Sequence, residues 1–367
     1  MTILGKEAMT SVALKARPQI VVGVDTHKDF HVASAKDQLG RSIGNIKAAT
    51  TELGYRKLLA WAQRLGVIES FGIEGPNSYG AGLARYLSEH GESVLEIGRP
   101  NRQRRARQGK TDFIDADMAA AAVLAGETVG VPKSGNGNVE SLRMLRVTRA
   151  SAVKAKGVAI VELQHLVITA PIEVREALAG LSARKKVRTC AQMTPVHEPK
   201  TPEEAAIFTL AFLARRYEFL EQEAKELERQ IERMVHTSCP ELLELPGVGP
   251  DVAATLLTAL GDNGGRIRSE AAFAKLCGVS PLDASSGRQV RHRLNRGGNR
   301  QANRALHTLI VVRLRIHQPS KDYIERRLAE GKTKKEVMRC LKRYAVREVY
   351  RTIRDTSSGD QHLLKVA

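Results

Sequence analysis

Short apolar runs alternate with amphipathic stretches in the first third of the chain. The run Gln19–Asp25 is continuous and rich in β-branched residues, which predicts a buried strand. Thr51 precedes the first helical pattern and is a residue type that caps helices. The order of three strands, then helix, strand, helix, strand and helix is typical of a mixed sheet covered by helices. The predicted strands cover 19–25, 30–35, 41–47, 70–74 and 93–97, and the predicted helices 51–65, 77–90 and 111–126, the last capped by Thr111 or Asp112.

Beyond Gly126 the pattern changes to long helices. Residues 126–138 are rich in Gly, Pro, Ser and Asn, which indicates a domain boundary. Residues 139–169 predict one long helix with basic and apolar faces, and residues 203–236 a second whose apolar seam fits an antiparallel hairpin or a coiled coil. Residues 171–202 are interrupted by prolines and are expected to be irregular. The predicted divisions are a loose tail (1–18), an α/β domain (19–130), a helical linker and coiled-coil region (139–236), a mainly helical C-terminal domain (241–354) and a second tail (355–367).

The net charge indicates a polyanionic partner. Lys and Arg number 58 and Asp and Glu 40, so the net charge is +18. No apolar run approaches the roughly 18 residues of a membrane-spanning helix, and we expect no signal peptide. The four cysteines form no CxxC pair, which excludes a recognisable zinc site and favours a reduced, cytosolic setting. The segments 99–110 and 286–316 are basic and contain no acid, which favours nucleic acid as the partner.

Acidic residues lie where the predicted strands and helices could bring them together. Asp25 ends the first strand, Glu74 ends the fourth, and Asp112 and Asp115 share one face of the last helix of the domain. Four converging carboxylates would repel one another unless cations neutralised them, and hard oxygen ligands suit Mg²⁺ or Mn²⁺. Taken singly, each could be a turn or capping residue. Asp117 is expected to point away from Asp112 and ranks lower.

Two segments of the C-terminal part could contact phosphate. Gly247 and Gly249 predict a tight turn before a helix, which could accept a phosphate or could simply connect two helices. Ser285 and Ser286 stand in a turn-forming sequence that is followed by arginines able to clamp a phosphate. The candidate nucleic-acid-binding residues are Arg102, Arg104, Arg105, Lys110, Gly247, Gly249, Arg288, Arg291, Arg293, Arg296 and Arg300.

Three motifs taken in order give a specific resemblance. The stretches Gly-Val-Asp25-Thr-His, Gly-Ile-Glu74-Gly-Pro and Lys-Thr-Asp112-Phe-Ile-Asp115 resemble the DEDD transposases of bacterial insertion sequences of the one-ten type, relatives of the Piv-type DNA invertases. The resemblance implies a RuvC-like (ribonuclease-H-like) domain whose catalytic, metal-binding acids are these four residues. The C-terminal segment resembles the same family and implies that Ser286 is the catalytic serine, with neighbouring Ser285 as its main rival.

The resemblance implies a transposase that forms a covalent serine–DNA intermediate beside Mg²⁺. It further implies guidance by a structured RNA, assembly as a homodimer or homotetramer, and a cytoplasmic, nucleoid-associated location in a bacterium. Two alternatives stay open at this point. A metal-dependent, junction-resolving endonuclease of RuvC-like type would need only the acids. A non-catalytic nucleic-acid-binding protein would explain the charge but leaves the four acids without a role.

Overall fold

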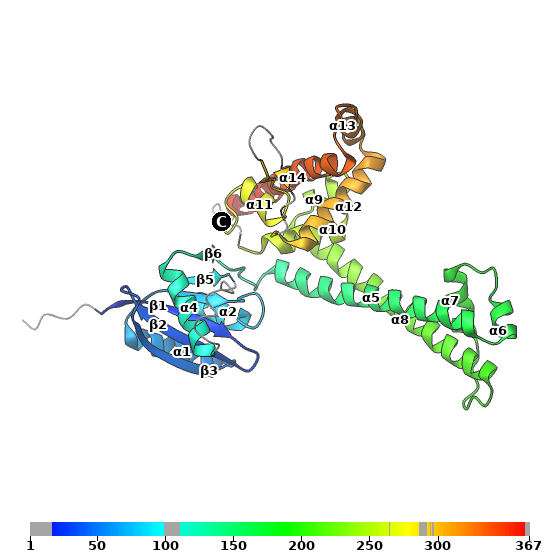
Figure 1. The fold of residues 1–367 in the computed structure, drawn as a ribbon, viewed down its shortest axis with the longest axis horizontal. Coiled ribbons are helices and arrows are strands. Elements are labelled where there is room, and N and C mark those ends of the chain that lie inside the picture. Colours follow the sequence, from blue (N-terminus) through cyan, green and yellow to red (C-terminus); the bar gives the residue numbers. More distant parts are fainter. Residues whose placement is uncertain are drawn as a thin grey trace, which may run out of the picture. The chain divides into compact units, whose positions relative to one another are not determined.

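The computed structural model describes residues 17–98, 111–263, 265–285, 292–293, 295 and 297–363, and the predicted tail 1–18 therefore lies almost wholly outside the described residues. The chain folds as two compact units, residues 1–135 and 136–367 (Figure 1). Within the described ranges, no helix is both long and apolar enough to cross a membrane.

The first unit contains a six-stranded mixed sheet in the order β3-β2-β1-β4-β5-β6. Strands β1, β2 and β3 form an antiparallel meander, and β1 pairs in parallel with β4, which confirms the predicted mixed sheet. The strands are β1 (Gln19–Thr26), β2 (Phe30–Asp37), β3 (Ser42–Ala49), β4 (Val67–Glu74), β5 (Val94–Ile97) and β6 (Thr128–Gly130), and the helices are α1 (Glu52–Leu65), α2 (Ala81–Glu89) and α4 (Asp112–Leu124).

Helix α2 begins four residues later than the prediction of 77–90. Gly75 has a φ of +66°, and its carbonyl accepts hydrogen bonds from the Ser78 amide (3.0 Å) and the Ser78 hydroxyl (3.0 Å). This turn occupies the residues that would have formed the first helical turn. Strand β6 was not predicted; its Thr128 and Gly130 pair with Ile97 and Glu96 of β5.

Helix α4 lies very close to β1 because small residues meet where the two elements pack. A Cβ atom added to Gly23 would come within 2.1 Å of both the Ala116 carbonyl oxygen and the Ala120 amide nitrogen. Gly72 on β4 likewise leaves room for the side chain of Val123, which would lie 2.4 Å from a Cβ atom added at position 72. Such distances are far below van der Waals contact, so the helix can pack here only while these strand positions have no side chain.

Two long helices of the second unit, α5 (Asn138–Thr169) and α8 (Pro202–Ser238), form an antiparallel hairpin. Arg149 pairs with Glu228 (3.1 Å), and one further heptad along, Lys156 pairs with Glu221 (3.5 Å), so the helices run in opposite directions. This is one of the two arrangements that the apolar seam predicted. Thr201 and Glu204 form a capping box at the start of α8.

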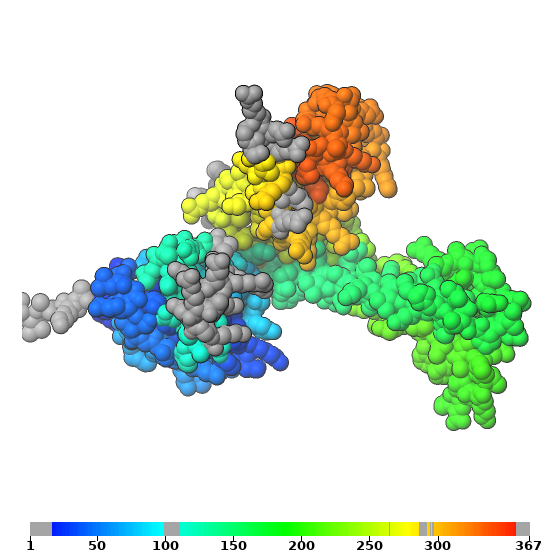
Figure 2. Space-filling view, viewed as in Figure 1, coloured from blue at the N-terminus to red at the C-terminus, as the bar shows by residue number. Residues whose placement is uncertain are grey.

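The expectation of irregular structure over 171–202 is wrong, because the segment contains α6 (Ile172–Ala177) and α7 (Ala183–Gln192). The hydroxyl of Ser182 caps α7 by accepting a hydrogen bond from the Lys185 amide (3.4 Å), and Cys190 is buried in a cluster with Leu163 and Leu210. Figure 2 shows the end of the hairpin broadened where these short helices add to it. Packing against α5 and α8 stabilises helices that local propensity alone did not indicate.

The remaining helices share one hydrophobic core with the base of the hairpin. Leu142 of α5 and Ile231 of α8 are buried in the same cluster as Leu256, Leu309 and Val349. The elements are α9 (Glu241–Glu244), α10 (Pro250–Leu260), α11 (Glu270–Leu276), β7 (Leu282–Asp283), β8 (His292–Arg293), α12 (Arg300–Ile316), α13 (Gln318–Ala329) and α14 (Lys334–Leu363).

The predicted tail at 355–367 is wrong up to Leu363, where α14 ends. Ile353 is buried in the core, and the Thr356 hydroxyl donates a hydrogen bond to the Glu241 carboxylate (2.9 Å). These interactions hold the helix beyond Arg354.

We predict that Gly23→Ala destabilises the first unit. The added methyl group must displace the α4 backbone, and overpacking of this kind costs about 1–3 kcal/mol or more. Urea unfolding followed by the fluorescence of Trp61, the single tryptophan of the chain and part of α1, measures the effect. Gly44→Ala is the control, because an added Cβ there meets its nearest atom at 3.4 Å. Equal stability of the two variants would contradict the prediction.

Candidate functional site

The candidate site lies at the end of β1, beside the end of β4. The parallel register pairs Val24 with Ile73, so the next residues along the two strands, Asp25 and Glu74, occupy neighbouring positions. The Thr26 hydroxyl donates a hydrogen bond to the Glu74 carbonyl (2.8 Å) and thereby ties the two strand ends together. The topology therefore places both acids at one edge of the sheet, as the sequence predicted.

The other two acids belong to the first turn of α4. Thr111 caps this helix, since its hydroxyl accepts a hydrogen bond from the Ile114 amide (3.3 Å). Acidic residues are favoured in a first helical turn because the helix dipole is positive there. Asp115 is buried, with 5% of its surface exposed, whereas Asp112 is partly exposed. Asp112 reaches the same space as Asp25, because both carboxylates lie near one histidine.

That histidine is His27, to which the sequence analysis assigned no role. Its Nε2 atom lies 3.2 Å from an oxygen of Asp25 and 3.4 Å from an oxygen of Asp112. One ligand atom from each of these residues lies within 4.8 Å of the other two. The backbone amide of His27 donates to the Phe30 carbonyl (3.1 Å), which closes the turn from β1 to β2. The only signal in the sequence was a histidine two residues after a strand-ending acid.

Electrostatics at this edge disfavour a negative charge on Asp25. Burial raises the pKa of the Asp25 carboxyl, the charges of Asp115 and Asp112 raise it further, and nearby His27 opposes them. A cation bound here would relieve this repulsion. Carboxylate oxygens are donors that a divalent ion such as Mg²⁺ or Mn²⁺ accepts, so the acids present fit such an ion. Two of the four predicted acids, Asp25 and Asp112, belong to the group around His27, and the charge of Asp115 is near enough to raise the pKa of Asp25.

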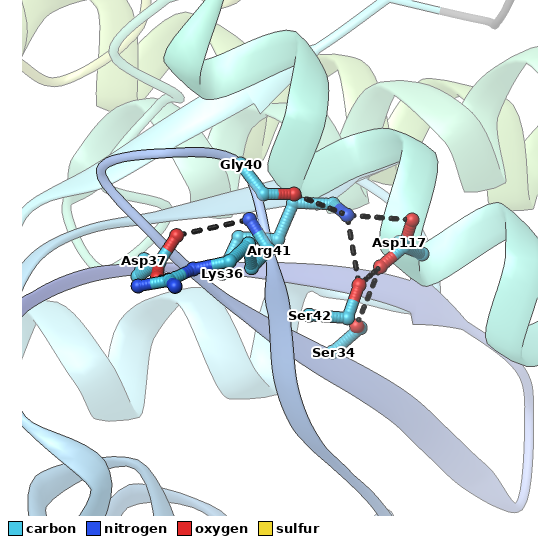
Figure 3. Close-up of polar contacts among 7 residues, drawn as sticks. All are labelled: Ser34, Lys36, Asp37, Gly40, Arg41, Ser42 and Asp117. Carbon is cyan, nitrogen blue, oxygen red and sulfur yellow. Dashed lines mark hydrogen bonds and ion pairs between the residues drawn. The ribbon is translucent and has the colours of Figure 1, made fainter.

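Asp117 belongs to a different polar network, shown in Figure 3. Its carboxylate pairs with the buried Lys36 amine (2.8 Å) and accepts hydrogen bonds from the hydroxyls of Ser34 (3.1 Å) and Ser42 (2.5 Å). Burial opposes ionisation, but the hydrogen bonds from Lys36 and Ser42 still hold the pKa of Asp117 below its usual value. Asp117 thus ties α4 to β2 and β3, and its lower rank among the candidate acids agrees with this position.

The glycine-rich turn packs against α12. Gly247 has a φ of +81°, and an added Cβ would meet the Leu309 carbonyl at 2.8 Å. The buried Arg313, one turn further along α12, donates a hydrogen bond to the Pro246 carbonyl (2.7 Å) and holds the turn against the same helix. Gly249 precedes α10 as its N-cap. These interactions account for the glycine at position 247 on structural grounds, and phosphate binding at this turn stays a prediction.

Few of the predicted basic residues and only one of the two candidate serines can be placed. Ser285 is exposed just after β7, Arg293 is exposed on β8, and Arg300 is the exposed first residue of α12. Outside the described residues lie Arg102, Arg104, Arg105, Lys110, Ser286, Arg288, Arg291 and Arg296.

The chain is similar to transposases and to proteins of bacterial insertion elements. A family model described as a transposase, of the DEDD IS110 type, matches residues 22–169, and a second, described as the transposase IS116/IS110/IS902 family, matches residues 239–325. An insertion element IS110 protein of 43.6 kDa from Streptomyces coelicolor is 32% identical over 137 residues, 36% of this chain. The transposase for insertion sequence element IS1328 of Yersinia enterocolitica is 23% identical over 251 residues, 68% of this chain. The chain spans 34% of the first relative and 71% of the second.

We predict that Mg²⁺ or Mn²⁺ raises the thermal stability of the first unit, monitored by Trp61 fluorescence. An ion at one hundred times its Kd would stabilise the folded state by about 2.7 kcal/mol. Asp25→Asn should abolish the increment because it removes a charged ligand. Glu89→Gln is the control: it removes the charge of an exposed carboxylate at the end of α2 and should keep the increment. A stability increment that survives Asp25→Asn would contradict the assignment.

Proposed function

Because the chain belongs to the IS110 family of transposases, we propose that it is a DNA transposase that cuts and rejoins the strands of a mobile element. The observation that carries the proposal is the convergence of Asp25 and Asp112 at one sheet edge, with Asp115 close enough to raise the pKa of Asp25. Carboxylates this close could hold a divalent cation, and in phosphoryl transfer such a cation would balance the negative charge of the substrate.

The proposed covalent step uses Ser286, on the strength of its match to the family motif. The hydroxyl oxygen attacks a DNA phosphorus atom, its proton passes to a base, and the bond between phosphorus and the leaving sugar oxygen breaks. The leaving oxygen takes up a proton and becomes a hydroxyl group. Attack by another DNA hydroxyl on the phosphoserine then restores the serine and joins the new strands. Arginines that follow Ser286 in the sequence would hold the phosphate oxygens.

The four acids are assigned to holding a divalent ion near the reacting phosphate. Asp25 and Asp112 are the proposed direct ligands, while Glu74 and Asp115 complete the acidic edge. When bound, Mg²⁺ or Mn²⁺ would supply the positive charge that stabilises phosphate oxygens during displacement. The position of His27 between two acids suits a residue that orients them.

The proposed partners are DNA, a guide RNA and further copies of the chain. A net charge of +18 favours binding to phosphate backbones of either nucleic acid. Guidance by base pairing would relieve the protein of reading a long sequence itself. We propose a homodimer or homotetramer in which the serine and the acids of one active site come from different subunits, working on DNA in the bacterial cytoplasm at the nucleoid.

A junction-resolving endonuclease is the second candidate. The acidic edge of the first unit favours it, because metal-dependent hydrolysis of DNA needs carboxylates and no serine. It leaves unexplained the C-terminal match, which a hydrolase of this kind does not require.

We predict that the protein forms a covalent adduct with DNA taken from either side of its coding sequence, in the presence of Mg²⁺ and RNA transcribed from the adjoining non-coding segment. The adduct would appear as protein-linked labelled DNA on a denaturing gel. Ser286→Ala should abolish it, Asp25→Asn should reduce it at least about a hundredfold, by analogy with the loss of a transition-state-stabilising group, and Ser285→Ala should leave it intact.

Other outcomes of this assay select other functions. Cleavage without an adduct, unchanged by Ser286→Ala but abolished by Asp25→Asn, would support the endonuclease. An adduct that moves to Ser285 would correct the choice of serine. Full activity without RNA would exclude the guide.

A further inference from the structure

A cavity of about 700 Å³ opens in the C-terminal part of the second unit. Its walls come from α13, α14, the turn at residues 278–281 and strand β8. Only Arg293, from β8, was among the nucleic-acid-binding candidates of the sequence analysis. The other basic residues of its lining therefore have no role in the proposed function so far.

The lining is strongly basic. Seven lysine or arginine side chains face a single carboxylate, that of Glu336. Just outside the lining, Glu270 pairs with two of the arginines and Glu330 with a third. Even after these three carboxylates are subtracted, an excess of four positive charges remains, which favours an anionic ligand. The basic residues are Arg293, Arg327, Lys332, Arg339, Lys342, Arg343 and Arg347.

Lys342 is held in place on one side of this cavity. Its amine donates a hydrogen bond to the Asn303 side-chain oxygen (2.9 Å). The Asn303 amide group donates in turn to the carbonyls of Cys277 (3.0 Å) and Gly278 (3.1 Å). Partial burial lowers the pKa of Lys342, so an anion that restored its lost solvation would bind favourably.

Two tyrosine rings stand in the same basic cavity. Tyr323 and Tyr344 meet edge to face, with ring centroids 5.6 Å apart. Tyr344 is 49% exposed, and the Arg347 guanidinium lies 6.0 Å from its ring centre. An exposed ring in a cavity lined by basic residues suits a ligand with both a negative charge and a flat aromatic group. Nucleotides of a single strand have both, whereas the bases of a duplex are already stacked.

We infer that this cavity binds a single-stranded segment of nucleic acid, with its phosphates at Lys332, Arg339 and Lys342 and one unstacked base against Tyr344. The inference rests on the proposed function in that the substrate is nucleic acid. It adds a second phosphate-binding region that the sequence motifs did not indicate. DNA and RNA share this chemistry, so the experiment tests both strands.

The first test measures binding of the full chain to labelled twelve-nucleotide single-stranded DNA, the matching RNA and a DNA duplex. Tyr344→Ala should weaken single-strand binding at least about fivefold, the change that corresponds to about 1 kcal/mol of lost stacking. Tyr344→Phe should bind like the wild type, and duplex binding should not change. Of the two single strands, DNA and RNA, the one whose binding Tyr344→Ala weakens more is identified as the natural ligand. Phe219→Ala removes an exposed ring of α8 outside the cavity and is the control.

The second test removes charge. The double variant Lys332→Gln and Arg339→Gln should lower the salt dependence of single-strand binding, with the slope of log K against log salt falling by about 1.4, or about 0.7 for each phosphate that is no longer neutralised. Lys154→Gln together with Arg351→Gln makes the same change of charge at exposed positions outside the cavity. If the slope fell equally in the two double variants, or fell in neither, the inference would be overturned.

A third test needs no variant. A strand containing 5-iodouracil, irradiated in complex with the wild-type chain, should crosslink to the peptide that contains Tyr344. Crosslinks found only elsewhere would overturn the inference.

Should the adduct assay fail while Tyr344→Ala still weakens binding, the proposed function is wrong and the cavity assignment stands. Should adducts form while all cavity variants bind like the wild type and Tyr344 escapes crosslinking, the cavity assignment alone is wrong.

Discussion

The close packing between β1 and α4 determines where the acids of the first unit lie. Gly23 gives the helix room to approach the strand, and Ala116 and Ala120 present only small surfaces to it. This approach sets the height of α4 over the sheet, while the bonds of Asp117 to Lys36, Ser34 and Ser42 fix its rotation (Figure 3). The acids repel one another and could not assemble themselves, so packing and a separate polar network hold them together.

Packing also explains how the chain tolerates a charge arrangement that opposes folding. Burial and two neighbouring carboxylates act against ionised Asp25, yet the strand that positions it is buried over Ile20, Val21, Val22 and Val24. Functional sites commonly break local rules that the surrounding structure obeys. Here burial of the apolar part of β1 stabilises the strand and offsets the cost of placing Asp25 at its end, in a geometry suited to a cation.

Local sequence signals predicted an element well where a single residue, such as a helix cap, determines it. They predicted it less well where packing against residues distant in the sequence determines it. Thr51 and Thr111 both cap helices as expected. The helices at 172–177 and 183–192 were missed because their burial depends on α5 and α8, and the late start of α2 reflects a turn closed by Ser78. His27 was given no role because its partners include Asp112, which lies far along the chain. The role of Ser286 remains a prediction, since position 286 lies outside the described residues.

The two hydrophobic clusters of the second unit differ in how far their members lie apart along the chain, and this has a consequence for folding. The cluster at the far end of the hairpin draws only on residues 160–217. The other joins Leu142 to Ile353, more than two hundred residues away. Since closing a long loop costs entropy before its native interactions form, the far cluster should assemble early during synthesis and the larger core last. The base of the hairpin then stays incomplete on the ribosome until α14 emerges.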